Sequence, residues 1–137
     1  MEADAIKVVA ALIRDSAGRV LLVRKRGTMA FMQPGGKRDR GEDDIAALAR
    51  EIAEELGCHL LRDSIQPLGE FDAVAANEPG RRVHACLYAV EVSGDVVPNR
   101  EIDATIWVDP STPPDIPLAP LTRDYVLPAA VSLRANA

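Results

Sequence analysis

Apolar residues dominate two segments near the beginning of the chain, Ile6–Arg14 and Arg19–Arg26. Short runs rich in Val, Leu, Ile and Ala are typical of buried strands. Between the two runs, Asp15–Gly18 has the composition of a turn. The pattern therefore predicts two strands that form a hairpin, followed by a loop over Gly27–Asp39 that contains a Pro-Gly-Gly sequence.

The periodicity becomes helical after Asp43. Apolar residues then recur at steps of three and four and form one stripe, which consists of Ile45, Leu48, Ala49, Ile52 and Leu56. Asp43 is suited to cap the N-terminus of such a helix, and Gly57 is suited to end it. The pattern therefore predicts an amphipathic helix over Asp44–Leu56 that packs its stripe on a sheet.

The second half of the chain predicts more strands and a closing helix. The strands are expected over Ile65–Val74, Val83–Val92 and Thr105–Val108. Five of the ten prolines fall within Asp109–Pro120, which predicts an irregular connector. A last helix is expected over Leu121–Arg134, with Thr122 as its cap and with Pro128 kinking or shortening it. This order of elements predicts an α+β fold.

Composition and charge narrow the class of protein. The chain has 137 residues, 47% of them hydrophobic, and we expect one domain over residues 1–137. No apolar run reaches the roughly 18 residues of a membrane span, and the acidic start is unlike a secretory signal. The net charge of −5 argues against a nucleic-acid partner. With only two cysteines, Cys58 and Cys86, the composition favours a cytoplasmic protein without a membrane partner.

Three glutamates of the predicted helix, Glu51, Glu54 and Glu55, fall within about a third of its circumference. Their centre lies away from the apolar stripe, so we expect them to point outward. Like charges at this spacing destabilise a helix by a few tenths of a kcal/mol per pair, although Arg50 can offset part of this through Glu54. A solvated surface is one explanation. The other is a metal site, because Mg²⁺ and Mn²⁺ prefer hard oxygen donors.

The residues around this helix follow a longer pattern. It consists of Gly36, five residues, Glu42, seven residues, Arg50-Glu51-Ile52, one residue, Glu54-Glu55, one residue, Gly57 and Cys58. Residues 36–58 thereby resemble the Nudix box, although Cys58 stands where an aliphatic residue is usual. The order of elements also resembles the α/β/α sandwich of that family, with a mixed central sheet. The resemblance implies a hydrolase that cleaves a pyrophosphate bond in a nucleoside diphosphate linked to another group.

The resemblance also implies roles for individual residues of the box. Three glutamates would hold Mg²⁺, for which Mn²⁺ can substitute, with help from a backbone carbonyl and an outer carboxylate; these are Glu51, Glu54, Glu55, Gly36 and Glu42. Arg50 would orient the cluster by pairing with a neighbouring carboxylate. An acidic protein would then bind an anionic substrate through cations.

A later carboxylate has a counterpart in similar proteins. MutT-type members carry a glutamate six residues before a tryptophan, where it contributes to metal binding or water activation. Here Glu101 precedes Trp107 by six residues, with Asp103 as a neighbouring competitor. Plain loop charge is the other interpretation of Glu101. Glu51 and Glu101 are both candidates for the general base.

Substrate contacts are expected near the Pro-Gly-Gly turn. As in similar proteins, one of the basic residues Arg24, Lys25 and Arg26 would reach the phosphates, and Lys37 and the backbone at Gly35 are further candidates. A charged strand end that faces water is the alternative. The resemblance favours a MutT-like enzyme that converts a (d)NTP to NMP and pyrophosphate. The alternatives are an ADP-ribose or nucleotide-sugar pyrophosphatase and a non-catalytic nucleotide sensor. Similar proteins are often dimers, so a homodimer is also expected.

Overall fold

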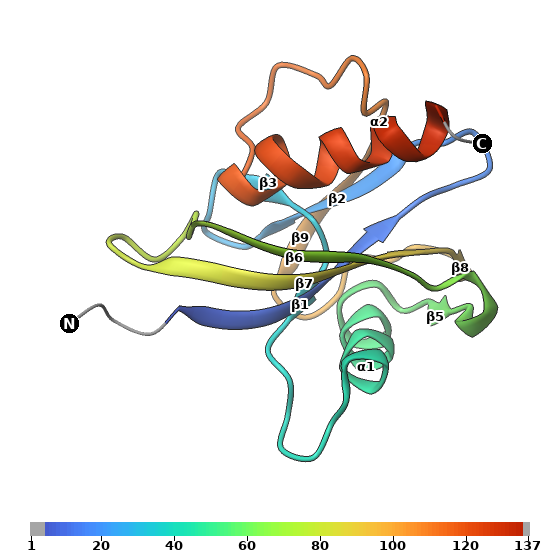
Figure 1. Ribbon diagram of the computed structural model, residues 1–137, viewed down its shortest axis with the longest axis horizontal. Coiled ribbons are helices and arrows are strands. Elements are labelled where there is room, and N and C mark those ends of the chain that lie inside the picture. The colour runs from blue at the N-terminus through green and yellow to red at the C-terminus, as the bar shows by residue number, and fades with distance from the viewer. Residues whose placement is uncertain (1–4, 136–137) are drawn as a thin grey trace.

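The computed structural model describes residues 5–135 and consists of strands between two helical layers (Figure 1). The larger sheet has the order β4 (Gly35–Gly36), β1 (Ile6–Ile13), β7 (Arg82–Val90), β6 (Gln66–Val74). The smaller sheet has the order β3 (Phe31–Met32), β2 (Val20–Lys25), β9 (Ile102–Val108). A third pair joins β5 (His59–Leu60) to β8 (Val92–Ser93). The larger sheet is mixed, because β1 pairs with β7 in parallel and with β4 antiparallel.

Two helices cover opposite sides of these sheets (Figure 1). One layer is α1 (Asp44–Leu56), and the other is α2 (Leu127–Ala135), preceded by a π-helical turn over Thr122–Val126. A short 3₁₀ helix, η1 (Arg62–Ser64), leads into β6. Each side of the sheets has its own apolar cluster. The expected α+β sandwich with a mixed sheet is therefore confirmed.

Strand β1 shows why the sequence reads as an unbroken apolar run. Val9, Ala11 and Ile13 belong to the cluster around α1, whereas Ala10 and Leu12 belong to the cluster around α2. A strand with both faces covered needs apolar residues at every position. β1 is therefore the central support on which both helical layers rest.

Helix α1 has the bounds that its sequence predicts. Asp43 caps it, with the carboxylate accepting a hydrogen bond from the Ala46 N–H at 2.8 Å. Gly57 ends it in the left-handed conformation at φ 66°, which a glycine adopts without strain. Leu48 and Ile52, in the centre of the predicted stripe, are fully buried. The helix is thus anchored by its apolar face and fixed at both ends.

The predicted hairpin of the first two strands is wrong. β1 and β2 belong to different sheets and share one bridge, between Arg14 and Val20, just after β1 ends. β1 instead pairs with β7 along its whole length, from Ile6–Val83 to Ile13–Val90. The many hydrogen bonds of this parallel ladder stabilise the fold more than a short hairpin with β2 would. The turn at Asp15–Gly18 specifies only that the chain reverses, and not that the two strands stay paired.

Short strands and the last helix also differ from the expectation. The predicted loop over Gly27–Asp39 contains β3 and β4, and the predicted strand Val83–Val92 divides at Glu91 into β7 and β8. Pro128 does not end the last helix, which continues to Ala135, although its α-helical part begins only at Leu127. The π-helical turn over Thr122–Val126 ends two residues before this proline. Its wider geometry relieves the clash that a proline ring makes with the carbonyl four residues earlier. Within residues 5–135, no helix is long and apolar enough to cross a membrane.

Candidate functional site

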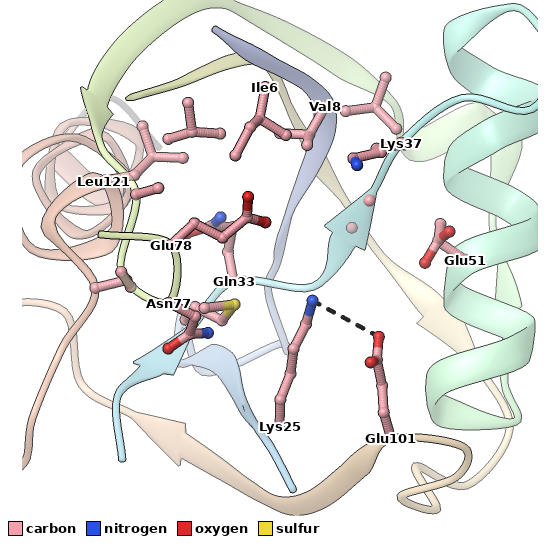
Figure 2. Close-up of a pocket in the computed structure, with 18 of the residues that line it drawn as sticks. Ile6, Val8, Lys25, Gln33, Lys37, Glu51, Asn77, Glu78, Glu101 and Leu121 are labelled. Atoms are coloured by element: carbon pink, nitrogen blue, oxygen red, sulfur yellow. Dashed lines mark ion pairs between the residues drawn. The ribbon is translucent and has the colours of Figure 1, made fainter. Parts of the chain in front are cut away.

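A pocket of about 420 Å³ opens between α1, the end of β2 and the loop that joins β6 to β7. Figure 2 shows that its two ends differ in character. Charged groups, among them Lys25, Glu51 and Glu101, line one end. Apolar side chains, among them Ile6 and Leu121, line the other end, where the carboxylate of Glu78 also points into the pocket.

The glutamates of α1 do not all point outward. Glu51 and Glu54 are partly exposed, but Glu55 retains only 4% of its surface and faces β4. Its Oε1 accepts a hydrogen bond from the Gly35 N–H at 3.3 Å. The expected outward direction is therefore wrong for Glu55, because α1 lies against β4 and position 55 falls on the side of that contact.

Two glycines let the backbone approach these carboxylates. A Cβ on Gly36 would lie 2.8 Å from the Glu51 carboxylate carbon, so any larger residue would displace that side chain. At Gly35 the backbone has φ 141°, and a Cβ would lie 2.2 Å from the Val9 carbonyl oxygen. The Pro-Gly-Gly sequence thus allows β4 to fit between β1 and the acidic face of α1.

Arg50 ties the acidic groups together. Its guanidinium donates to both carboxylate oxygens of Glu42, at 2.7 and 2.9 Å. It also donates to Glu51 at 2.9 Å, to Glu54 at 2.8 Å and to the Lys37 carbonyl at 3.0 Å. These contacts fix the carboxylates and the loop before the helix in one arrangement. They also hold the pKa of Glu42 at about 2.

Glu51 and Glu55 are more buried than Glu42, and their pKa values shift in the opposite direction. Burial raises the pKa of Glu51 despite its bond to Arg50. Burial, followed by the neighbouring charge of Glu51, raises the pKa of Glu55 to about 7. Glu51 and Glu55 therefore repel each other in a partly desolvated place, and a bound cation would offset this repulsion. An all-oxygen donor set of this kind fits Mg²⁺ or Mn²⁺.

Basic residues at the end of β2 divide between two places. Lys25 lines the pocket, with its Nζ 3.6 Å from Oε1 of Glu101 (Figure 2). Arg24 is not among the lining residues; it pairs with Asp103 at 3.1 Å and lies over the Phe31 ring. Arg26 is also outside the lining, and its backbone N–H donates to the Glu101 carbonyl at 2.6 Å.

Of the three adjacent basic residues that the sequence offers for the phosphates, Lys25 is the one that lines the pocket. Strand alternation explains this, because Leu21 and Val23 pack in the cluster around α1 and Lys25 continues the same face of β2. Lys37, another candidate from the sequence, lines the pocket as well. The pocket therefore collects two lysines beside its glutamates.

The apolar end of the pocket includes two amide side chains, Gln33 and Asn77 (Figure 2). Thr122 is fully buried behind Gln33, and its hydroxyl donates to Oε1 of Gln33 at 2.7 Å. The expectation that Thr122 caps the last helix is therefore wrong, since it lies within the helical segment and makes no capping bond. Its hydroxyl instead fixes a residue of the pocket wall.

Comparisons with known proteins agree with this arrangement. A family model described as the NUDIX domain matches residues 5–129. The chain is 32% identical over 137 residues to the CTP pyrophosphohydrolase of Escherichia coli, covering 95% of this chain and 94% of that protein. It is 34% identical over 76 residues to the 8-oxo-dGTP diphosphatase of Haemophilus influenzae, covering 53% of this chain and 56% of that protein. The crystal structure of a MutT NUDIX hydrolase from Burkholderia pseudomallei superposes with a TM-score of 0.74 at 26% identity, covering 95% of this chain and 98% of that one.

Proposed function

Because the chain belongs to the Nudix hydrolase family, we propose that it is a Mg²⁺-dependent pyrophosphohydrolase that converts a nucleoside triphosphate to a nucleoside monophosphate and pyrophosphate. The observation that carries this proposal is the two-ended pocket. Its charged end has carboxylates and a lysine for a metal-bound polyphosphate, and its apolar end has room for a base.

The box residues would hold the cation. In this proposal the ligands are the carboxylates of Glu51, Glu54 and Glu55 and the carbonyl of Gly36, with Glu42 as an outer ligand. A bound divalent cation would neutralise the phosphate oxygens and lower the pKa of the attacking water. Arg50 keeps the carboxylates oriented through its hydrogen bonds to three of the acidic side chains.

Two carboxylates at the charged end could accept the proton of the attacking water. Glu51 lies on α1, and Glu101 lies across the pocket beside Lys25 (Figure 2). Glu101 has 62% of its side chain exposed, which leaves it accessible to water and substrate. The pH–rate profiles of Glu51→Gln and Glu101→Gln separate the two roles, because the variant that lacks the base loses the acidic limb of the profile.

Phosphate contacts are assigned to the basic groups inside the pocket. Lys25 lines its charged end, whereas Lys37 lies beside Val8 in Figure 2; the Gly35 backbone also lines the pocket. Arg24 is engaged by Asp103 outside this lining, so among the three adjacent basic residues we assign the phosphate contact to Lys25. A lysine is a compact point charge that suits a phosphate oxygen beside a cation.

The apolar end is proposed as the base subsite. Because Thr122 donates to Oε1 of Gln33, the amide nitrogen of Gln33 is the donor that remains for a base edge. Asn77 offers a second amide on the same wall. The names of the relatives specify CTP and 8-oxo-dGTP as substrates of those proteins, which supports a nucleoside triphosphate here.

A nucleotide panel with Mg²⁺ or Mn²⁺ tests the proposal. It should include CTP, dCTP, GTP, 8-oxo-dGTP, ADP-ribose and a UDP-sugar, with pyrophosphate and phosphate measured separately. We expect pyrophosphate release from at least one triphosphate and its loss with EDTA. Cleavage of ADP-ribose or the UDP-sugar alone would replace the proposal with a nucleotide-sugar pyrophosphatase. Nucleotide binding without any turnover would identify a sensor instead.

A further inference from the structure

A second group of potential metal ligands lies on β6 and β7, outside the pocket. The strand register pairs Glu70 with Cys86 and Asp72 with His84. His84 and Cys86 are two residues apart on one strand, so their side chains share a face of the sheet. The potential ligand atoms of Glu70, His84 and Cys86 lie within 4.8 Å of one another. This face is only partly covered, because the sheet extends past α1 in Figure 1.

We propose that Glu70, His84 and Cys86 form a binding site for a transition-metal ion of the Zn²⁺ type, separate from the Nudix box. The donor set is one carboxylate oxygen, one imidazole nitrogen and one thiol sulfur. Such mixed donors favour Zn²⁺ and related ions, whereas Mg²⁺ favours oxygen alone. Three protein ligands leave a fourth, open position in a tetrahedral site.

Asp72 supports this assignment through the second nitrogen of the imidazole. Its Oδ1 lies 2.8 Å from Nδ1 of His84, while Nε2 lies 2.7 Å from Oε1 of Glu70. Without a metal, both ring nitrogens donate a hydrogen to a carboxylate; a bound ion would replace the hydrogen on Nε2, while Nδ1 continues to donate to Asp72. A carboxylate that orients a ligating histidine in this way is a recurrent feature of zinc sites.

The thiol of Cys86 also has a fitting neighbour. Nη2 of Arg38 lies 3.3 Å from its Sγ, and Nε of Arg38 pairs with Asp44 at 2.6 Å. The guanidinium of Arg38 therefore holds the sulfur in place on the face that it shares with His84. Asp44 compensates the charge of Arg38, which reduces the repulsion between the guanidinium and a bound cation.

Solvent can reach this group. Glu70 has 65% of its side chain exposed and His84 has 29%, so an ion needs no opening of the core to enter. Because Glu70 and Asp72 raise the pKa of His84, protons compete with the metal for this residue. Binding is therefore best measured at about pH 8.

Cobalt titration of the metal-free protein tests the site. We expect Co²⁺ to produce the intense near-ultraviolet absorption of a thiolate-to-cobalt bond together with the visible bands of tetrahedral Co²⁺. One equivalent of Zn²⁺ should remove both signals. His84→Asn and Cys86→Ser should each abolish the thiolate signal, and Asp72→Asn should weaken binding by about 10-fold or more.

Matched variants exclude other sources of the signal. Cys58→Ser removes the other, fully buried cysteine and should retain the absorption. Glu54→Gln alters the box and should also retain it, which separates this proposal from the proposed hydrolysis. Circular dichroism confirms that each variant is folded. Absence of the thiolate signal from the unaltered protein, or its persistence in folded His84→Asn, would overturn the proposal.

Discussion

The two acidic clusters of this protein are built in opposite ways. The first lies on α1, contains oxygen donors only and is oriented by Arg50. The second lies across β6 and β7, mixes oxygen, nitrogen and sulfur, and has Asp72 behind its histidine. A helix brings residues three and four apart together without outside help, whereas a strand cluster exists only when its partner strand is in register. The donor atoms of a site therefore do not decide whether the sequence can reveal it. A site within one helix can be predicted from spacing, whereas a site across two strands cannot.

Removing a carboxylate of the α1 cluster should cause the largest loss of turnover. If turnover did not fall, the α1 cluster would not be the metal site. Glu54→Gln keeps the size of the side chain but removes a proposed metal ligand on a partly exposed face. We expect turnover of the best triphosphate to fall by about 10²–10³-fold, the scale of losing one preorganised electrostatic group. Steady-state kinetics measures the loss, and Glu91→Gln, on an exposed residue, is the control. Unchanged turnover in Glu54→Gln would refute the metal assignment.

Replacing Arg50 tests whether Mg²⁺ binding depends on how the carboxylates are oriented as well as on their presence. Arg50→Lys keeps the positive charge but cannot contact Glu42, Glu51 and Glu54 together. We expect the Mg²⁺ concentration for half-maximal activity to rise by about 10–100-fold, as for other residues that orient ligands. Activity is measured over a Mg²⁺ series, with Arg62→Lys on η1 as the control. An unaltered Mg²⁺ dependence would mean that the helix alone positions the carboxylates.

Asp44 begins the helix of the first cluster and is linked through Arg38 to Cys86 of the second. Replacing it tests whether the two clusters act independently. At the start of α1 it accepts hydrogen bonds from Arg38 and from the Tyr88 hydroxyl. Asp44→Asn weakens a charge-assisted bond and should lower the free energy of unfolding by about 1–2 kcal/mol. Urea unfolding measures this, with the exposed Asp63→Asn as the control.

Turnover of Asp44→Asn is the informative second measurement. We expect it to stay within about threefold of the unaltered protein, because Asp44 contacts none of the box carboxylates in the hydrogen bonds of the described residues. A large loss of turnover in a folded variant would show that the loop around Arg38 couples the two clusters.

The apolar end of the pocket belongs to neither cluster, and a replacement there should show the smallest effect. Thr122→Val removes the hydroxyl that fixes Gln33 while nearly preserving the volume of the side chain. We expect KM to rise about fivefold, equivalent to about 1 kcal/mol for one neutral hydrogen bond, with kcat unchanged. Ser132→Ala, an exposed residue on α2, is the control. A fall in kcat at constant KM would argue against a role in base binding.

The α1 cluster could be predicted from the sequence because helical spacing is local. The bounds of α1, its cap at Asp43 and its end at Gly57 follow from residues within the helix or next to it. Even there, the inward direction of Glu55 could not be foreseen. It depends on the contact with β4, a two-residue strand formed by glycines that carry no hydrophobic pattern.

Long-range pairing explains what the sequence could not reveal. The β1–β7 ladder joins residues more than seventy positions apart, and nothing near β1 indicates its partner. The group of Glu70, His84 and Cys86 depends on the same sheet, because only the β6–β7 register brings its members together. Thr122 looks like a helix cap by residue type, and only tertiary structure shows that it contacts Gln33.

The guanidinium of Arg50 also makes the effects of replacing its carboxylate partners depend on one another. Because Glu42, Glu51 and Glu54 all bond to one group, replacing any one of them alters the surroundings of the others. Residues in one network do not contribute additively. The effect of a second replacement therefore depends on the first, so during divergence these four positions should change together or not at all.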